Sequence, residues 1–157
     1  MKLKVFCLIL VFSLTSLAQA EPGIHPFETD YCTSFPEGTK DHPDLWAHCC
    51  LEHDLYFWAG GTKVDRDEAD LGLRACVEAT GEIHIARLMY LGVTLGQLSP
   101  VKFETRKWGN GWGEERKYEA LTPHEILLIE DQVTTSGDLI PEPILNRFLK
   151  NLHSRLE

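Results

Sequence analysis

A run of six residues, Cys-Cys-Leu-Glu-His-Asp at positions 49–54, constrains the fold of this chain more than any other feature. It sets two adjacent cysteines about one helical turn before a His-Asp pair. Asp70 follows 16 residues after Asp54, and Cys76 comes six residues after Asp70. Cysteines at such spacings from titratable side chains fit two antiparallel helices that disulfides hold in register.

Residues 1–20 have the features of a secretory signal peptide. A basic start precedes an apolar run over residues 5–17, and small residues follow at 18–20. The apolar run is shorter than the ~20 residues that a membrane-spanning helix needs. We therefore expect cleavage near Ala20 and an exported mature chain, residues 21–157, that forms a single domain in the periplasm or outside the cell.

The expected mature chain is strongly acidic. The full sequence has a net charge of −9, and removal of Lys2 and Lys4 leaves 13 basic against 24 acidic residues, a net charge of −11. This charge disfavours nucleic acid and strongly anionic membranes as partners. It is compatible with a bound divalent cation.

The four cysteines of the mature chain indicate disulfides, because the chain is expected to be exported and their number is even. A bridge between the adjacent Cys49 and Cys50 would be strained within a helix. Cys32 and Cys76 should therefore each bond to one member of the pair, which leaves two possible pairings. A zinc site is the alternative, but adjacent cysteines in a helix cannot easily face one tetrahedral metal. Its candidate ligands are Cys32, His48, Cys49, Cys50 and His53.

The hydrophobic pattern predicts a mainly α fold. Asp44 and the pair Asp65 and Glu68 have the residue types that begin helices. The first two helices should be antiparallel neighbours because the connection at residues 60–64 is short. Helices are predicted over residues 44–59, 65–79, 82–98, 123–133 and 143–156, with an irregular segment at 100–118 in which two tryptophans are expected to cover the core.

The helix rise tests the alignment of the first two helices. His53 lies ~6 Å along its helix from Cys49, and Asp70 lies ~9 Å along its helix from Cys76. If a disulfide joins these cysteines, His53 and Asp70 differ by only ~3 Å in height, within reach of a side-chain contact. Asp67 would be mismatched by ~7.5 Å. The geometry thus favours Cys49–Cys76, with Asp70 as the partner of His53.

The second bridge of this pairing, Cys32–Cys50, determines the surroundings of Asp54. Asp54 shares a helix face with Cys50 and so points toward the loop around Cys32. A carboxylate beside a loop with free carbonyl oxygens offers the oxygen ligands that suit Ca²⁺.

The motif Cys-Cys-x-x-His-Asp resembles the signature of secreted phospholipase A2, and the resemblance covers about residues 30–80. It implies a phospholipase A2-like core of two antiparallel, disulfide-linked helices, with residues 81–157 as a helical extension. It also implies calcium-dependent hydrolysis of phospholipid acyl esters, with a phospholipid or membrane interface as partner.

In that family the histidine activates water, the adjacent aspartate binds Ca²⁺ and the second aspartate holds the histidine. These roles fall here to His53, Asp54 and Asp70. The loop carbonyls that would complete the calcium site are those of Tyr31, Thr33 and Phe35.

The chain also departs from the family pattern. A family disulfide is missing at both ends, at Tyr56 and Ala69, and a supporting tyrosine is replaced by Phe57. Residues 30–39 stand in place of the glycine-rich calcium loop. The core motif, with Phe-Pro-Glu-Gly-Thr at 35–39, is also similar to a group of bacterial exported proteins. The alternative function is a non-catalytic, disulfide-stapled module that binds lipid or protein on the same scaffold.

Overall fold

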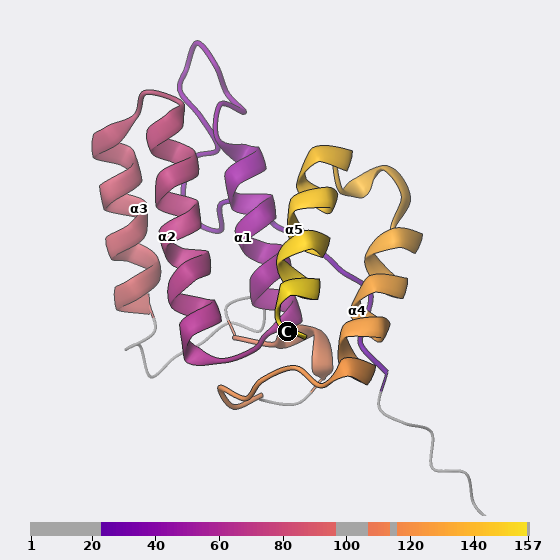
Figure 1. Cartoon of the computed structure of the whole chain (residues 1–157). Helices are drawn as coiled ribbons and strands as arrows, with labels where there is room; N and C mark the ends of the chain where they lie inside the picture. The colour runs from indigo at the N-terminus through magenta and orange to yellow at the C-terminus, as the bar shows by residue number, and fades with distance from the viewer. Residues whose placement is uncertain (1–22, 97–106, 114–115, 157) are drawn as a thin grey trace, which may run out of the picture.

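The computed structural model describes residues 23–96, 107–113 and 116–156, and these are mainly helical (Figure 1). No strand occurs within these ranges. Together with two disulfides, this confirms the prediction of a mainly α, disulfide-linked fold. The helices are α1 (Ala47–Ala59), α2 (Lys63–Ala79), α3 (Ile83–Gly96), α4 (Pro123–Thr135) and α5 (Glu142–Ser154), with short 3₁₀ turns η2 (Asn110–Trp112) and η3 (Gly137–Leu139).

The helices lie side by side in the order α3, α2, α1, α5, α4 (Figure 1). The first three run antiparallel through short connections, and α4 and α5 pack on the other side of α1. Helix α1 is therefore buried on two faces. Leu55 and Trp58 join the core with α4 and α5, whereas Cys49 and Cys50 join the core with α2 and α3. Because helices pack on both sides of α1, apolar residues lie around most of its circumference, and its polar face is narrower than that of a surface helix.

Two of the predicted helix starts are displaced. Helix α1 begins at Ala47 instead of Asp44, and Trp46 is its N-terminal cap residue. The backbone N–H of Trp46 donates to the carbonyl of Glu37 (2.9 Å), and its indole N–H donates to the carbonyl of Pro36 (2.6 Å). Backbone contacts with the preceding loop, and not a side-chain cap, thus determine where α1 starts.

Helix α2 begins at Lys63, and Thr62 is its cap. The Thr62 hydroxyl accepts a hydrogen bond from the backbone N–H of Asp65, whose carboxylate in turn accepts from the N–H of Thr62. Asp65 is therefore the third helical residue of a capping box and not the residue before the helix. The later boundaries fall within two residues of those predicted, except that residues 97 and 98 lie outside the described ranges.

Three tryptophans fix the C-terminal end of α1. The indole N–H groups of Trp58, Trp108 and Trp112 donate hydrogen bonds of 2.8 to 2.9 Å to the carbonyls of His25, Gly61 and Ala59 respectively. Trp108 is only 5 % exposed, so it covers the core as expected.

This packing requires glycine at position 111. A Cβ atom added there would lie 2.5 Å from the indole nitrogen of Trp58.

Within the described residues, no helix is long and apolar enough to cross a bilayer. The predicted signal peptide lies outside these residues.

Candidate active site

Two disulfides join the helices around the candidate site. They are Cys32–Cys50 and Cys49–Cys76, with Cα–Cα distances of 5.1 and 5.6 Å, and they are the pairs that the helix geometry favours. All four cysteines of the expected mature chain are therefore in disulfides. A cluster of His48, Cys49 and Cys76 brings three metal-ligand atoms together, but two of these atoms are the sulfurs of one disulfide. The zinc alternative therefore has no thiolate ligand.

His53 and Asp70 form a buried pair between α1 and α2. The Nε2 atom of His53 lies 2.8 Å from Oδ1 of Asp70, and the two side chains are 9 % and 2 % exposed. Asp67, the poorer candidate, instead pairs with Lys63 on the surface at 2.6 Å. Because Nε2 faces a carboxylate, it is assigned the proton, and Nδ1 is the ring nitrogen that can accept a proton from water.

Asp54 is tied to the loop that contains Cys32. Its Oδ2 atom accepts a hydrogen bond of 2.6 Å from the Thr29 hydroxyl, which in turn accepts one of 2.9 Å from the backbone N–H of Tyr31. Burial raises the pKa of Asp54 to about 7 against the opposing hydrogen bond from Thr29, and the nearby charge of Asp30 raises it further. A cation beside Asp54 would offset both unfavourable effects on its carboxylate.

The loop at residues 30–35 turns without glycine. Tyr31 and Ser34 have φ values of 56° and 63°, in the left-handed region that glycine adopts most easily. The backbone N–H of Phe35 closes a turn onto the carbonyl of Cys32 at 2.8 Å. Among the described residues, no hydrogen bond uses the carbonyls of Tyr31, Thr33 or Phe35. Carboxylate and backbone carbonyl oxygens are the ligand types that a hard cation such as Ca²⁺ takes, so the residue types of this loop and of Asp54 fit such a cation.

These side chains and the loop line one pocket of about 310 Å³. All the predicted metal-ligating residues border it, together with His53, while Asp70 lies behind the histidine. Helix α3 supplies an apolar wall through Leu88, Met89 and Val93. A Cβ atom added at Gly92, which also lines the pocket, would meet no described atom within 4 Å. The arrangement combines a few convergent polar groups with apolar lining, as in sites for small amphiphilic molecules.

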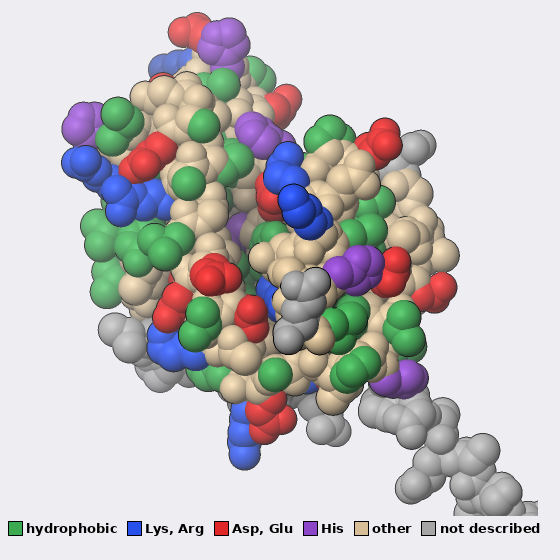
Figure 2. Space-filling view, viewed as in Figure 1, with side chains coloured by type: hydrophobic (Ala, Val, Ile, Leu, Met, Phe, Trp, Pro, Cys, Tyr) green, Lys and Arg blue, Asp and Glu red, His purple; other side chains and the backbone are tan. Residues whose placement is uncertain are grey.

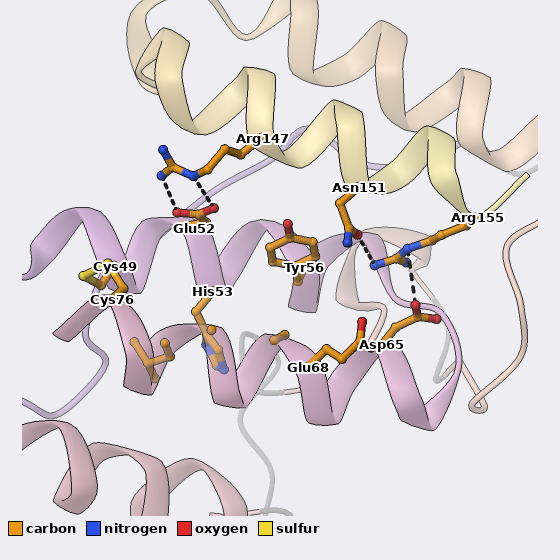
Figure 3. A pocket seen from close by; sticks show the side chains of 13 residues that line it. Cys49, Glu52, His53, Tyr56, Asp65, Glu68, Cys76, Arg147, Asn151 and Arg155 are labelled. Carbon is orange, nitrogen blue, oxygen red and sulfur yellow. Dashed lines mark hydrogen bonds and ion pairs between the residues drawn. A yellow bond between two sulfur atoms is a disulfide. The ribbon is translucent and has the colours of Figure 1, made fainter. Parts of the chain in front are cut away.

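A second pocket, of about 380 Å³, lies between α1, α2 and α5 (Figure 3). Arg147 and Arg155 reach from the α5 side to Glu52 and Asp65, with N–O distances of 2.7 and 3.3 Å. His53 also borders this pocket. Although this pocket is the larger, these charged side chains already pair with one another, and the oxygen-rich loop is absent from its lining. We therefore place the candidate chemistry in the smaller pocket.

Two residues of the smaller pocket and its surroundings were not identified from the sequence. Thr29 gave no signal, because its contact with Asp54 spans 25 residues. Arg66 lines the pocket, and its only sequence signal is its position one helical turn before Asp70. The ring of Phe57, where the resemblance leads one to expect tyrosine, lies 4.4 Å from the His53 ring.

Comparison with family models, curated proteins and solved structures found no significant match for this chain.

Proposed function

We propose that this protein hydrolyses the acyl esters of phospholipids in a calcium-dependent reaction. The observation that carries this proposal is the shared pocket of His53 and Asp54. One is a histidine held at 2.8 Å by the buried carboxylate of Asp70, and the other is a carboxylate in the same pocket as backbone oxygens that no described residue hydrogen-bonds. A general base and a hard-cation donor set within one pocket are the parts that ester hydrolysis by activated water requires.

His53 acts as the general base. Its Nδ1 atom accepts a proton from a water molecule as the water attacks the ester carbonyl carbon. The imidazolium that forms is stabilised by Asp70, whose carboxylate also fixes the orientation of the ring. The proton then passes from His53 to the departing alcohol oxygen, and a fatty acid and a lysophospholipid are released. No acyl-enzyme forms.

The residues proposed to hold Ca²⁺ are Asp54, through its carboxylate, and Tyr31, Thr33 and Phe35, through their carbonyls. A bound Ca²⁺ supplies positive charge that polarises the ester carbonyl and stabilises the developing oxyanion. Thr29 positions the Asp54 carboxylate, and the left-handed conformations of Tyr31 and Ser34 shape the loop.

The apolar surface of α3 supports a lipid substrate. Figure 2 shows hydrophobic side chains gathered over this helix, and Leu88, Leu91 and Leu95 are each more than half exposed. Leu88 also lines the pocket, so the exposed surface continues into the site. We propose that this face meets the phospholipid interface from which a substrate molecule enters.

The disulfides suggest an oxidising environment. We propose that residues 1–20 are a signal peptide and that the mature protein acts in the periplasm or outside the cell.

A non-catalytic module that binds lipid or protein is the second candidate. It is favoured by the hydrogen bond from Thr29, which satisfies one oxygen of Asp54 without a metal. On this alternative the pocket holds a lipid chain but His53 activates no water.

Release of fatty acid from mixed phospholipid micelles distinguishes the two candidates. Wild-type protein should be active with Ca²⁺ and inactive with chelator, and His53→Gln should lose activity. His48→Gln is the matched control, because His48 is an exposed histidine on the same helix. If wild-type protein releases no fatty acid from several phospholipid classes at saturating Ca²⁺, the hydrolase proposal is wrong.

A further inference from the structure

Arg66 is a buried cation without a carboxylate partner among the described residues. Arg66 is 4 % exposed, and it is the one arginine among the described residues that is buried. Four other arginines of the described chain form ion pairs at 2.5 to 3.3 Å, and Arg87, which forms none with a described residue, is exposed to solvent. The four are Arg74, Arg116, Arg147 and Arg155.

Aromatic rings hold the guanidinium group of Arg66 in place. It lies 4.9 Å from the centre of the Phe57 ring and 5.8 Å from that of Tyr118, and its Nη1 donates to the Tyr118 hydroxyl at 2.6 Å. Its Nε atom is buried and makes no hydrogen bond with a described residue. Cation–π contacts offset only part of the cost of burying a positive charge. Within the described residues, the positive charge of Arg66 therefore has no anionic partner and only these aromatic contacts to offset its burial.

The position of Arg66 indicates what could compensate it. Arg66 lines the pocket that also contains His53 and Asp54. The planar guanidinium group binds oxyanions such as phosphate through two parallel hydrogen bonds, and it is more weakly hydrated than an ammonium group. Phe57 has no hydroxyl group that could accept a hydrogen bond from Arg66. It contacts the guanidinium group only through the face of its ring.

We infer that Arg66 binds the phosphate group of the molecule that occupies this pocket. The assignment of that phosphate to a phospholipid depends on the proposed function, whereas binding of an oxyanion by Arg66 does not. Inorganic phosphate offers the same chemistry, so the test separates the two sources.

The test measures binding by wild-type protein, Arg66→Met and Arg74→Met, with chelator present so that metal makes no contribution. The probes are inorganic phosphate, a short-chain diether phosphocholine whose ether bonds cannot be hydrolysed, and the corresponding diether glycerol without the phosphate. Methionine keeps an apolar chain against Phe57. Arg74 is a matched control, since it lies on the same helix, 5.8 Å from the Tyr90 ring, and lines neither pocket.

Arg66→Met should weaken binding of the phosphocholine probe by ~10- to 100-fold, the range expected for loss of a charged hydrogen bond. Binding of the uncharged diether should change little, and Arg74→Met should bind both probes as wild type does. Equal weakening for both diethers would show that Arg66 serves only the packing, and unchanged binding of both the phosphocholine and inorganic phosphate would show that it binds no phosphate. Either result overturns the inference.

Two further outcomes separate this inference from the proposed function. Binding of the phosphocholine probe that depends on Arg66, without any ester hydrolysis by wild type, would support the inference and reject the hydrolase. Binding of inorganic phosphate that depends on Arg66, without any preference for the phosphocholine over the uncharged diether, would support an oxyanion site and exclude the lipid as its source.

If Arg66→Met fails to fold, Arg66→Lys gives the same test. It keeps the charge but loses the planar fork, and should bind the phosphocholine more weakly than wild type while binding the uncharged diether equally.

Discussion

His53 and Asp70 contact each other at 2.8 Å because the Cys49–Cys76 disulfide aligns the helices that carry them. His53 is one turn beyond its cysteine, and Asp70 is nearly two turns before its own, so the two side chains meet at almost the same height. The disulfide therefore sets the position of His53 relative to Asp70. The proposed roles of the two residues, His53 as general base and Asp70 as its supporting carboxylate, can be tested by replacing each in turn.

Replacement of His53 should be more damaging than replacement of Asp70. His53→Gln removes the general base and should lower kcat by ~10²–10⁴-fold. Asp70→Asn leaves the ring in place but removes the charge that stabilises the imidazolium, so the loss should be smaller. Initial rates of fatty acid release at saturating Ca²⁺ measure both effects. Asp67→Asn, an exposed carboxylate on the same helix, should have wild-type activity, and a larger loss for Asp70→Asn than for His53→Gln would contradict the assigned roles.

The two disulfides should contribute similarly to stability but differently to activity. The sequence separation of the bonded cysteines is 27 residues for Cys49–Cys76 and 18 residues for Cys32–Cys50. In the chain-entropy model, removal of either bridge should lower the free energy of unfolding by ~3–4 kcal/mol. Loss of Cys49–Cys76 should misalign His53 and Asp70 and so lower kcat, whereas loss of Cys32–Cys50 should release the loop beside Asp54 and so weaken Ca²⁺ binding.

Urea denaturation of paired Cys→Ser variants, with kcat and Ca²⁺ affinity measured on the folded fractions, tests this difference. Equal effects of both variants on kcat and on Ca²⁺ affinity would show that the bridges do not act locally.

The sequence predicted the alignment of α1 and α2 because that alignment follows from local quantities. The rise per residue of a helix and the positions of Cys49, His53, Asp70 and Cys76 are sufficient for the arithmetic. The helix starts were less accurate. Helix α1 starts where Trp46 contacts the backbone of the preceding loop at Pro36 and Glu37, and such contacts leave no periodic signal in the sequence.

Thr29 and Arg66 show why the rest of the site could not be predicted. A threonine and a helical arginine are ordinary surface residues in a sequence. Their roles follow from burial and from contacts across 25 residues for Thr29 and Asp54, and across 52 residues for Arg66 and Tyr118. The same holds for α5, whose amphipathic pattern predicted a helix but not its ion pair between Arg147 and Glu52 on α1.

Removal of the Asp54 charge should abolish the response of the protein to Ca²⁺. At a Ca²⁺ concentration of ~100 Kd, wild type should gain ~2.7 kcal/mol of stability, and Asp54→Asn should gain none. Asparagine is nearly the same size and can still accept the Thr29 hydrogen bond, so the fold should be retained. Thermal unfolding with and without Ca²⁺ measures the effect. Asp41→Asn, an exposed residue of the preceding loop, should respond as wild type does, and a Ca²⁺ shift that survives in Asp54→Asn would place the metal elsewhere.

Without metal, the protein should lose stability as the pH rises toward neutrality. The pKa of Asp54 is about 7 in the folded protein and 3.8 for an ordinary carboxyl group. Between these values the folded state binds a proton at Asp54 that the unfolded state has released. The favourable contribution is therefore complete below pH 3.8 and is lost as the pH rises through about 7. Ca²⁺ binding should displace this proton, so Ca²⁺ affinity should increase over the same interval.

The difference in melting temperature between wild type and Asp54→Asn, recorded from pH 4 to pH 8 in chelator, isolates this residue from the other titrating groups. Relative to Asp54→Asn, wild type should become less stable with increasing pH, and saturating Ca²⁺ should reverse this trend. A difference that stays constant with pH would mean that Asp54 is ionised throughout the range, and that its burial does not hold a proton on the carboxyl group.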